Sequence, residues 1–169
     1  MPGSSPVDIV SFSFEVTLRM MQTGCSQVLG LESGTIHDEQ IRASSFRNSW
    51  LRGRWYPHLA RLHKEGRVNA WQAGEWIEVN FWKPVKVTEV VTQGASSYRI
   101  TSSPLFKVFH GNDDSERIQE NLLDIPIIAR FFRIHPLEYI GRPTLRLEIL
   151  GCNNQSKTSS FLYHIFAEH

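Results

Sequence analysis

A large apolar pair, Trp50 and Leu51, stands among basic residues in the stretch SFRNSWLRGRWYPHLARLHKEGRVNAW. Large apolar side chains are usually buried, so one interpretation places the pair in the core at the end of a strand. The neighbouring Arg47, Arg52 and Arg54 favour another, because unpaired charges in a core are costly. We therefore expect the pair to project outward, toward a surface that is apolar inside and negatively charged outside.

Basic residues gather in the same part of the chain, although the net charge is only +1. Seven Lys or Arg residues and one acid lie between Arg42 and Arg67, whereas five acids and one base lie between Asp113 and Asp124. One region of the folded chain is thus expected to be positive and another negative. An ordinary solvated face remains an alternative for such a run. The candidate contact residues are Arg47, Arg52 and Arg54, followed by Lys64 and Arg67.

Catalytic and metal chemistry find little support in the sequence. It contains no GxSxG, HExxH or phosphate-binding loop, and a glycosidase would need two suitably placed carboxylates. The histidines lack metal-ligand spacing, and Asp113 and Asp114 follow a Gly-Asn pair that is typical of a turn rather than of a Ca²⁺ site. We expect no enzymatic activity, no cofactor and no metal ion.

Nucleic acid is a second possible binding partner for the basic residues. Trp50, Trp55 and Tyr56 could serve as stacking platforms for bases beside the arginines. No known nucleic-acid motif accompanies them, and the pI of about 7.9 is modest. We therefore expect no nucleic-acid partner.

Short alternating runs of apolar residues predict strands at 75–81, 86–94, 105–110, 127–136 and 144–152. In the last run, Leu145, Leu147 and Ile149 are expected inward, with Arg146 and Glu148 outward. Five or more short strands separated by Pro, Gly, Asn and Ser favour an antiparallel sandwich or jelly roll. No apolar run reaches 18 residues, so no transmembrane segment is expected.

Three further side chains are expected to be structural. Arg61 lies within the apolar stretch ARLH, where it most simply makes a structural ion pair. Trp71 and Trp76 are expected to bring their rings into the sheet interior.

The chain has two cysteines, Cys25 and Cys152, which are too few for a structural zinc site of that type. They are either two free thiols of an intracellular protein or a bridge across a loop of about 127 residues, for which the chain-entropy model gives roughly 4–5 kcal/mol. The sequon at Asn154 favours an exported, glycosylated chain, although sequons also occur by chance.

Seven ordered blocks between the cysteines resemble the discoidin, or factor V/VIII type C (F5/8 type C), domain family. They are CSQVLGLESGTIHDEQIRASSF, ARLHKEGRVNAW, WIEVNF, VTEVVTQGA, FHGN, IIARFFRIHP and RPTLRLEILGC. Seven motifs in order are a specific signal. The stretch from ASSFRNSW to NAWQA is most similar to the C domains of coagulation factors V and VIII.

The resemblance implies a discoidin-like jelly-roll β-sandwich, galactose-binding-domain-like, with Cys25 and Cys152 joined. Its domain would span 25–152, after an N-terminal extension (1–24) and before a tail (153–169). It further implies an extracellular module of a larger chain that binds phosphatidylserine membranes, with Trp50 and Leu51 as the inserting pair. The alternative ligands, glycans or cell-surface proteins in adhesion, would use the same end of the sandwich.

Two segments are shorter than the family pattern. Four residues separate Trp71 from Trp76, and only SSYRITSSPL separates TQGA from FKVFHGN. A further loop and most of one hairpin are therefore expected to be missing. The sequence predicts no role for the terminal FLYHIFAEH.

Overall fold

The structure is a computed structural model. It describes residues 25–51, 53–94, 112, 114–137, 139 and 142–153, together with the backbone of 108–110 and 162–168. Within these ranges the fold is all-β, with ten strands and two short 3₁₀ helices, as expected. In the same ranges no helix combines the length and the hydrophobicity that crossing a membrane requires.

The elements follow one another along the chain as short pieces at first and long strands later. They are β1 (Gln27–Val28), η1 (Asp38–Gln40), β2 (Ile41–Ala43), β3 (Asn48–Ser49), β4 (Gly53–Arg54), η2 (Pro57–Leu59), β5 (Trp71–Gln72), β6 (Ile77–Gln93), β7 (Val108–His110), β8 (Ile118–Pro136), β9 (Thr144–Asn153) and β10 (Leu162–Glu168). The main strand order is β1-β9-β6-β8-β10-β7, with β2 beside β6 and β5 beside β9. Strands β3 and β4 form a separate hairpin.

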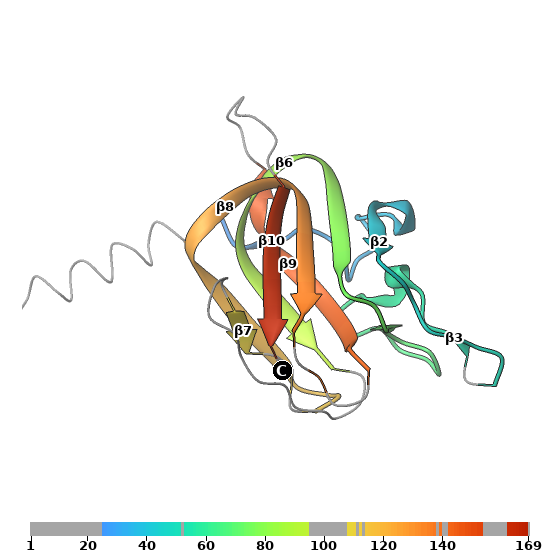
Figure 1. Cartoon of the computed structure of the whole chain (residues 1–169). Coiled ribbons are helices and arrows are strands. Elements are labelled where there is room, and N and C mark those ends of the chain that lie inside the picture. Colours follow the sequence, from blue (N-terminus) through green and yellow to red (C-terminus); the bar gives the residue numbers. More distant parts are fainter. Residues whose placement is uncertain are drawn as a thin grey trace, which may run out of the picture.

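Strands β6 and β8 build both layers of a sandwich, because each changes direction part-way along (Figure 1). Residues 77–80 of β6 pair with β2 on one side and with 131–134 of β8 on the other. After a register shift between Asn80 and Val85, residues 85–93 pair with 118–129 of β8 and with β9. Such an irregularity bends a strand and lets it continue into a second layer.

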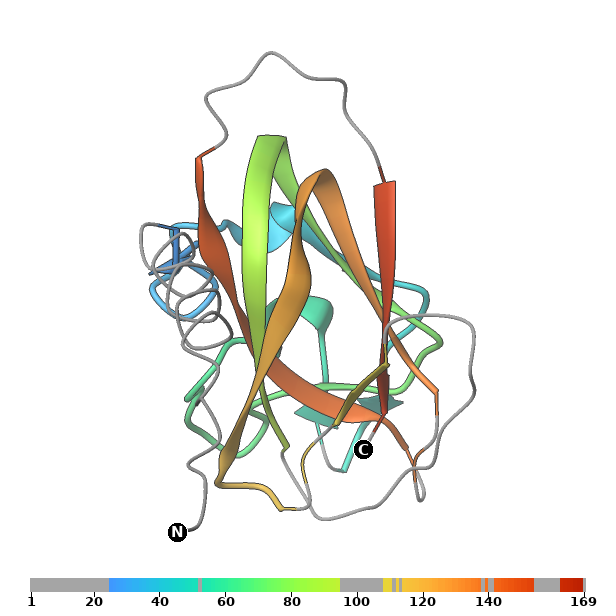
Figure 2. The ribbon, with the colours of Figure 1, turned by 90° about the vertical axis from the view of Figure 1, so that its left-hand side faces the viewer.

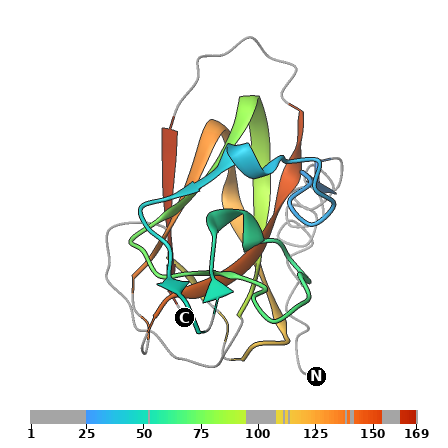
Figure 3. The same cartoon turned by 90° about the vertical axis from the view of Figure 1, so that its right-hand side faces the viewer.

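A single hydrophobic cluster joins the two halves of these strands. It contains Ile77, Val79, Phe132 and Ile134 from the first layer, Val87 and Val90 from the second half of β6, Leu145, Leu147 and Ile149 from β9, Trp71 from β5 and Leu31 from the loop after β1. The segment that carries η1 and η2 lies over one face of the sheet (Figure 3). The core therefore fixes the base from which the β3–β4 hairpin leaves.

The two cysteines form a disulfide bond, with Cα atoms 5.0 Å apart across 127 residues of sequence. The bond joins the chain just before β1 to the end of β9. Beside it, the Thr88 hydroxyl donates to the Cys25 carbonyl oxygen at 2.7 Å. The alternative of two free thiols is therefore wrong.

The outward orientation expected for Arg146 and Glu148 is wrong, since the residues are only 7% and 1% exposed. Both faces of strand β9 are buried. Alternation of apolar and polar residues identifies one buried face but cannot reveal that the other face is buried as well. The Glu148 carboxylate accepts the backbone N–H groups of Leu31 and Glu32 at 3.1 and 2.9 Å. The Arg146 guanidinium donates to the carbonyl oxygen of Gly94 at 2.6 Å. Loop backbone thus satisfies the Glu148 carboxylate and both Nη atoms of Arg146, whereas Arg146 Nε is buried without a hydrogen-bond partner.

The structural ion pair expected of Arg61 is confirmed. Its Nη2 lies 2.6 Å from Asp38 Oδ1, and this hydrogen bond lowers the pKa of the Asp38 carboxyl. Trp71 is fully buried, as expected. Trp76 is half-buried instead, with the Arg133 guanidinium 4.1 Å from its ring centre.

Candidate functional site

The apolar pair lies at the tip of the β3–β4 hairpin, which projects away from the sandwich (Figure 1). Asn48 pairs with Arg54 and Ser49 with Gly53, so residues 50–52 form the connection. The Trp50 side chain is 92% exposed and that of Leu51 is 62% exposed. Two large apolar side chains therefore stand in solvent, on a hairpin that contributes no residue to the core cluster.

The shape of the tip depends on Gly53 and on the loop that follows Leu62. Gly53 has a φ of +91°, a conformation that L side chains rarely adopt, and a Cβ there would lie 2.5 Å from Val68 Cγ2. Arg67 Nη2 donates to the Leu51 carbonyl oxygen at 2.6 Å. The loop that carries Arg67 and Val68 thus supports the tip from one side.

Arg47 connects the base of the hairpin to the sheet. Its Nη1 donates to Gln72 Oε1 at 2.5 Å, and its backbone N–H donates to the Gln72 carbonyl oxygen at 2.7 Å. Its own carbonyl oxygen accepts the Trp55 N–H at 2.9 Å. Gln72 is buried and donates in turn to Thr144 Oγ1 at 2.7 Å. Half-buried Arg47 therefore positions the hairpin as well as carrying charge.

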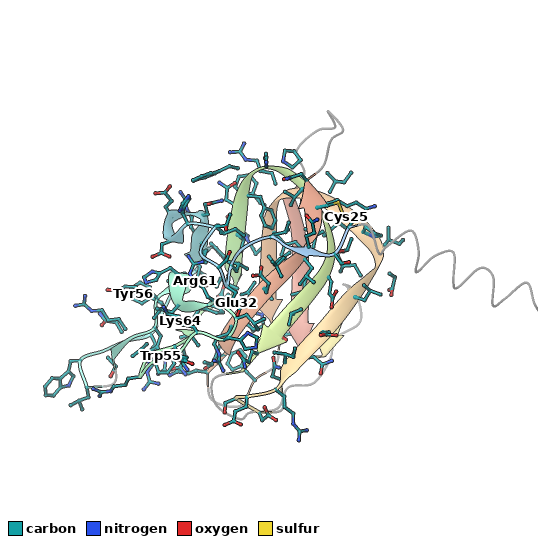
Figure 4. All side chains as sticks on the ribbon, turned by 180° about the vertical axis from the view of Figure 1, so that it is seen from behind. Cys25, Glu32, Trp55, Tyr56, Arg61 and Lys64 are labelled. Carbon is teal, nitrogen blue, oxygen red and sulfur yellow. A yellow bond between two sulfur atoms is a disulfide. The ribbon has the colours of Figure 1, made fainter. Side chains whose placement is uncertain are left out.

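A row of aromatic rings, tilted between Phe46 and Tyr56 and stacked between Tyr56 and His58, lies at the base of the hairpin. Phe46 and Tyr56 have ring centres 4.7 Å apart, and Tyr56 and His58 have ring centres 5.3 Å apart. Arg54 Nη1 donates to the Tyr56 hydroxyl at 3.1 Å. Figure 4 shows Trp55 and Tyr56 where the hairpin leaves the body. The row was not predicted from the sequence. When the hairpin register is continued by two pairs beyond Asn48–Arg54, residue 46 lies opposite residue 56.

The predicted basic residues separate into three groups in the structure. Arg54 and Arg67 are exposed and lie on or against the hairpin. Lys64 is exposed but is close enough to Asp38 to lower the pKa of that carboxyl, so it belongs to the adjoining face beside η1. Arg52 and the sequon residue Asn154 lie outside the described residues.

Neither a metal-binding cluster nor the surface cavity beside the disulfide accompanies the hairpin in the part of the chain that the structure describes. Within the described ranges, no three His, Cys, Asp or Glu side chains are grouped to hold a metal ion. The Asp114 carboxylate accepts the N–H groups of Glu116 and Arg117 at 2.9 and 2.7 Å, as the turn interpretation expects. A surface cavity of about 310 Å³ beside the disulfide is lined in part by Trp82 and Lys83 and lies away from the hairpin.

A family model described as the F5/8 type C domain matches residues 40–149. The chain belongs to this family. The β-sandwich that the resemblance implied is therefore confirmed both by the fold and by the family match.

Individual relatives are similar over most of this chain. It is 42% identical to coagulation factor V of Mus musculus over 158 residues, 77% of this chain and 7% of that protein. It is 42% identical to coagulation factor VIII of Canis lupus familiaris over 175 residues, 85% of this chain and 7% of that protein. It is 41% identical to lactadherin of Rattus norvegicus over 157 residues, 76% of this chain and 37% of that protein.

The chain thus spans a minor part of the length of these relatives. The alignment with factor V is 158 positions long yet holds only 77% of a 169-residue chain, so the relative carries residues that this chain lacks. This agrees with the expected shortening between the family blocks. A solved structure of CpGH89 from Clostridium perfringens, in complex with GlcNAc-alpha-1,4-galactose, matches with a TM-score of 0.44 at 13% identity, over 73% of this chain and 15% of that one.

Proposed function

We propose that this F5/8 type C domain docks onto membranes that carry anionic phospholipid, phosphatidylserine in particular. The observation that carries the proposal is the exposure of Trp50 and Leu51 on a hairpin tip that the neighbouring loop supports. Exposure of two large apolar side chains to water is unfavourable in free energy, and their burial in a lipid surface is favourable.

The basic residues have different roles in this proposal. Arg54 and Arg67 would meet the phosphate and carboxylate groups around the inserted pair, and Arg52, which lies outside the described residues, is proposed from its place in the sequence to do the same. Arg47 keeps the hairpin in position through Gln72. Lys64 adds to the long-range attraction from the adjoining face. No metal ion and no cofactor takes part, and the role is binding rather than catalysis.

The expected affinity is that of a reversible contact. Burial of a large apolar side chain contributes roughly 1.5–3 kcal/mol, and each basic residue near an anionic leaflet contributes about 1 kcal/mol. Part of this gain is lost to the cost of association, which is several kcal/mol. A single domain should therefore bind weakly, and a second membrane-binding module in the same chain would strengthen attachment through avidity.

The cellular setting of the proposal is extracellular. A disulfide that closes most of the domain is typical of oxidising compartments. The relatives are much longer than the matched region, which supports a module within a larger secreted chain that attaches peripherally to membranes.

Co-sedimentation with vesicles tests the proposal directly. We expect the wild-type chain to pellet with phosphatidylserine-containing vesicles and not with vesicles of phosphatidylcholine alone. The double substitution Trp50→Ala/Leu51→Ala should reduce binding at least tenfold, since two inserting groups are worth several kcal/mol. Its melting temperature should change little, because both side chains are exposed.

A matched control removes an exposed tryptophan elsewhere. Trp82 is 52% exposed and lies beside the disulfide cavity rather than on the hairpin. Trp82→Ala should retain vesicle binding. Equal binding of the wild type to phosphatidylcholine vesicles would contradict the phosphatidylserine proposal.

The aromatic row at the hairpin base favours one second candidate function. Phe46 and Tyr56 present ring surface beside Arg54, and such surfaces also stack against sugars or protein side chains. A glycan- or protein-binding adhesion role would be favoured if Phe46→Ala abolished binding to a glycan array while Trp50→Ala/Leu51→Ala had no effect.

A further inference from the structure

Strand β10 (Leu162–Glu168) lies between two other strands rather than at an edge of the sheet. It pairs in parallel with residues 131–136 of β8 through six positions and with β7 through three positions. Figure 2 shows β9 rising on the left and β10 descending on the right, with β6 and β8 between them. A segment that the sequence analysis left without a role is thus in an interior position of the sheet.

The strand edge that β10 covers belongs to the core. Residues 131–134 of β8 pair with β6 on one side and with β10 on the other, and Phe132 and Ile134 are almost fully buried there. Without β10 the other side of this segment would present a row of unpaired backbone groups. Among the strands that the structure describes, β7 has β10 as its one pairing partner.

The register agrees with the sequence pattern of the segment. Alternate residues fall beside buried positions of β8: Tyr163 beside Phe132, Ile165 beside Ile134 and Ala167 beside Pro136. The polar residues His164 and Glu168 fall in the other set, with His164 beside Arg133. A slip by one residue would set both polar residues beside the buried positions. Leu162 and Phe166 share the second set, so it is the two polar residues alone that favour this register over one shifted by a single residue.

The connection from β9 is long enough to reach this position. Asn153 of β9 pairs with Val85, Val85 pairs with Ala129, and β10 begins beside Phe131, so both strand ends lie at nearly the same level. Three strand spacings of about 4.8 Å separate β9 from β10. Residues 154–161, at about 3.3 Å each when extended, can span nearly twice that distance.

We propose that residues 162–168 are an integral strand of this domain, which fills a strand-accepting site between β7 and β8. The domain then extends from Cys25 to Glu168 instead of ending at Cys152. The residues that this chain lacks relative to its relatives are expected just before β7, and the C-terminal segment supplies the backbone partners for that part of the sheet. The occupant of the site is the chain's own segment, bound by β-strand addition.

Hydrogen exchange of the full-length chain tests this proposal through Phe166→Pro. Phe166 has a strand on either side, beside His135 and Val108, and proline lacks the N–H of a ladder and is not tolerated in the interior of a sheet. We expect the amides of 131–135 and 108–110 to exchange at least about tenfold faster in the variant. The matched control Thr158→Pro places proline in the polar stretch before β10 and should leave these amides protected.

Three outcomes would overturn the proposal. Unchanged protection at 131–135 in Phe166→Pro would mean that the segment does not pair with β8. Protection that rises with concentration, together with a dimer in size-exclusion chromatography, would mean that a second copy supplies the strand. If the variant fails to fold, the unmodified chain decides: absence of nuclear Overhauser effects between 162–168 and 131–136 would exclude the pairing. Vesicle binding is not a readout here, so failure of one proposal leaves the other standing.

Discussion

Arg61 and Glu148 together hold the loop that follows Gly30. The Glu148 carboxylate accepts N–H groups of this loop, that of Leu31 among them, whereas the Arg61 guanidinium donates to carbonyl oxygens of Leu31 and Ile36. One anion and one cation thus satisfy complementary sets of backbone groups, which explains why charged residues are tolerated in the core. Neither is free to meet a ligand.

Glu89 on β6 is a charged residue without such compensation. Burial raises the pKa of its carboxyl, and the nearby Glu120 raises it further. Because the folded state then binds a proton more tightly than the unfolded state, stability falls as pH rises from the ordinary glutamate pKa through the raised one. At neutral pH the charged carboxylate is therefore a small cost.

We expect Glu89→Gln to raise the unfolding free energy at pH 7 by less than about 0.5 kcal/mol. The melting temperature at this pH should therefore rise slightly. The gain should disappear below the ordinary glutamate pKa, where the wild-type side chain is protonated. Melting curves of both proteins between pH 3.5 and 7 measure this. A gain that is independent of pH would contradict the electrostatic explanation.

The β3–β4 hairpin depends, at the scale of the element, on one residue with unusual backbone geometry. We expect Gly53→Ala to cost about 1–2 kcal/mol in unfolding free energy, since the positive φ is strained and the new Cβ meets Val68. Vesicle binding should fall as well, because the tip must shift to relieve the contact. Thermal unfolding and co-sedimentation measure the two effects.

Gly34→Ala is a suitable control for this substitution. Gly34 has a φ of +80° and open space around its Cβ position, so alanine there brings the backbone strain without the contact. It should lower stability and leave vesicle binding unchanged. Equal loss of binding in both variants would show that the geometry at Gly53 has no special role.

Most of the long strands were predictable, whereas the hairpin and the first half of β8 were not. Strands β6 and β9 and residues 127–136 of β8 carry the alternation that predicted them, but residues 118–126 of β8 were not predicted as a strand. Strands β3 and β4 have two residues each and therefore no period to detect. The exposure of Trp50 followed from its basic neighbours. The link from Arg47 to Gln72 could not be predicted in this way, because it joins residues 25 positions apart through the packed sheet.

The disulfide determines stability at the scale of the whole molecule. It closes a loop of 127 residues, and the chain-entropy model gives roughly 4–5 kcal/mol for such a closure. We expect Cys25→Ser/Cys152→Ser to melt at least about 10 °C lower than the wild type. Thermal unfolding with and without reductant measures this: the wild type should approach the variant when reduced, and the variant should not respond. A shift of one or two degrees would mean that the Thr88 bond and the pairing of β1 with β9 already hold the two ends together.

The place of β10 between β7 and β8 also has a consequence for biosynthesis. A ribosome releases β7 and β8 well before the strand that pairs with both, and translation proceeds at roughly 5–20 residues per second. For some seconds the edge of β8 beside its buried apolar residues is therefore unpaired. During part of this time Cys25 has not yet formed its disulfide bond with Cys152. Chaperones of the oxidising compartment are therefore expected to bind this domain late in its synthesis, at the edge that the final strand closes.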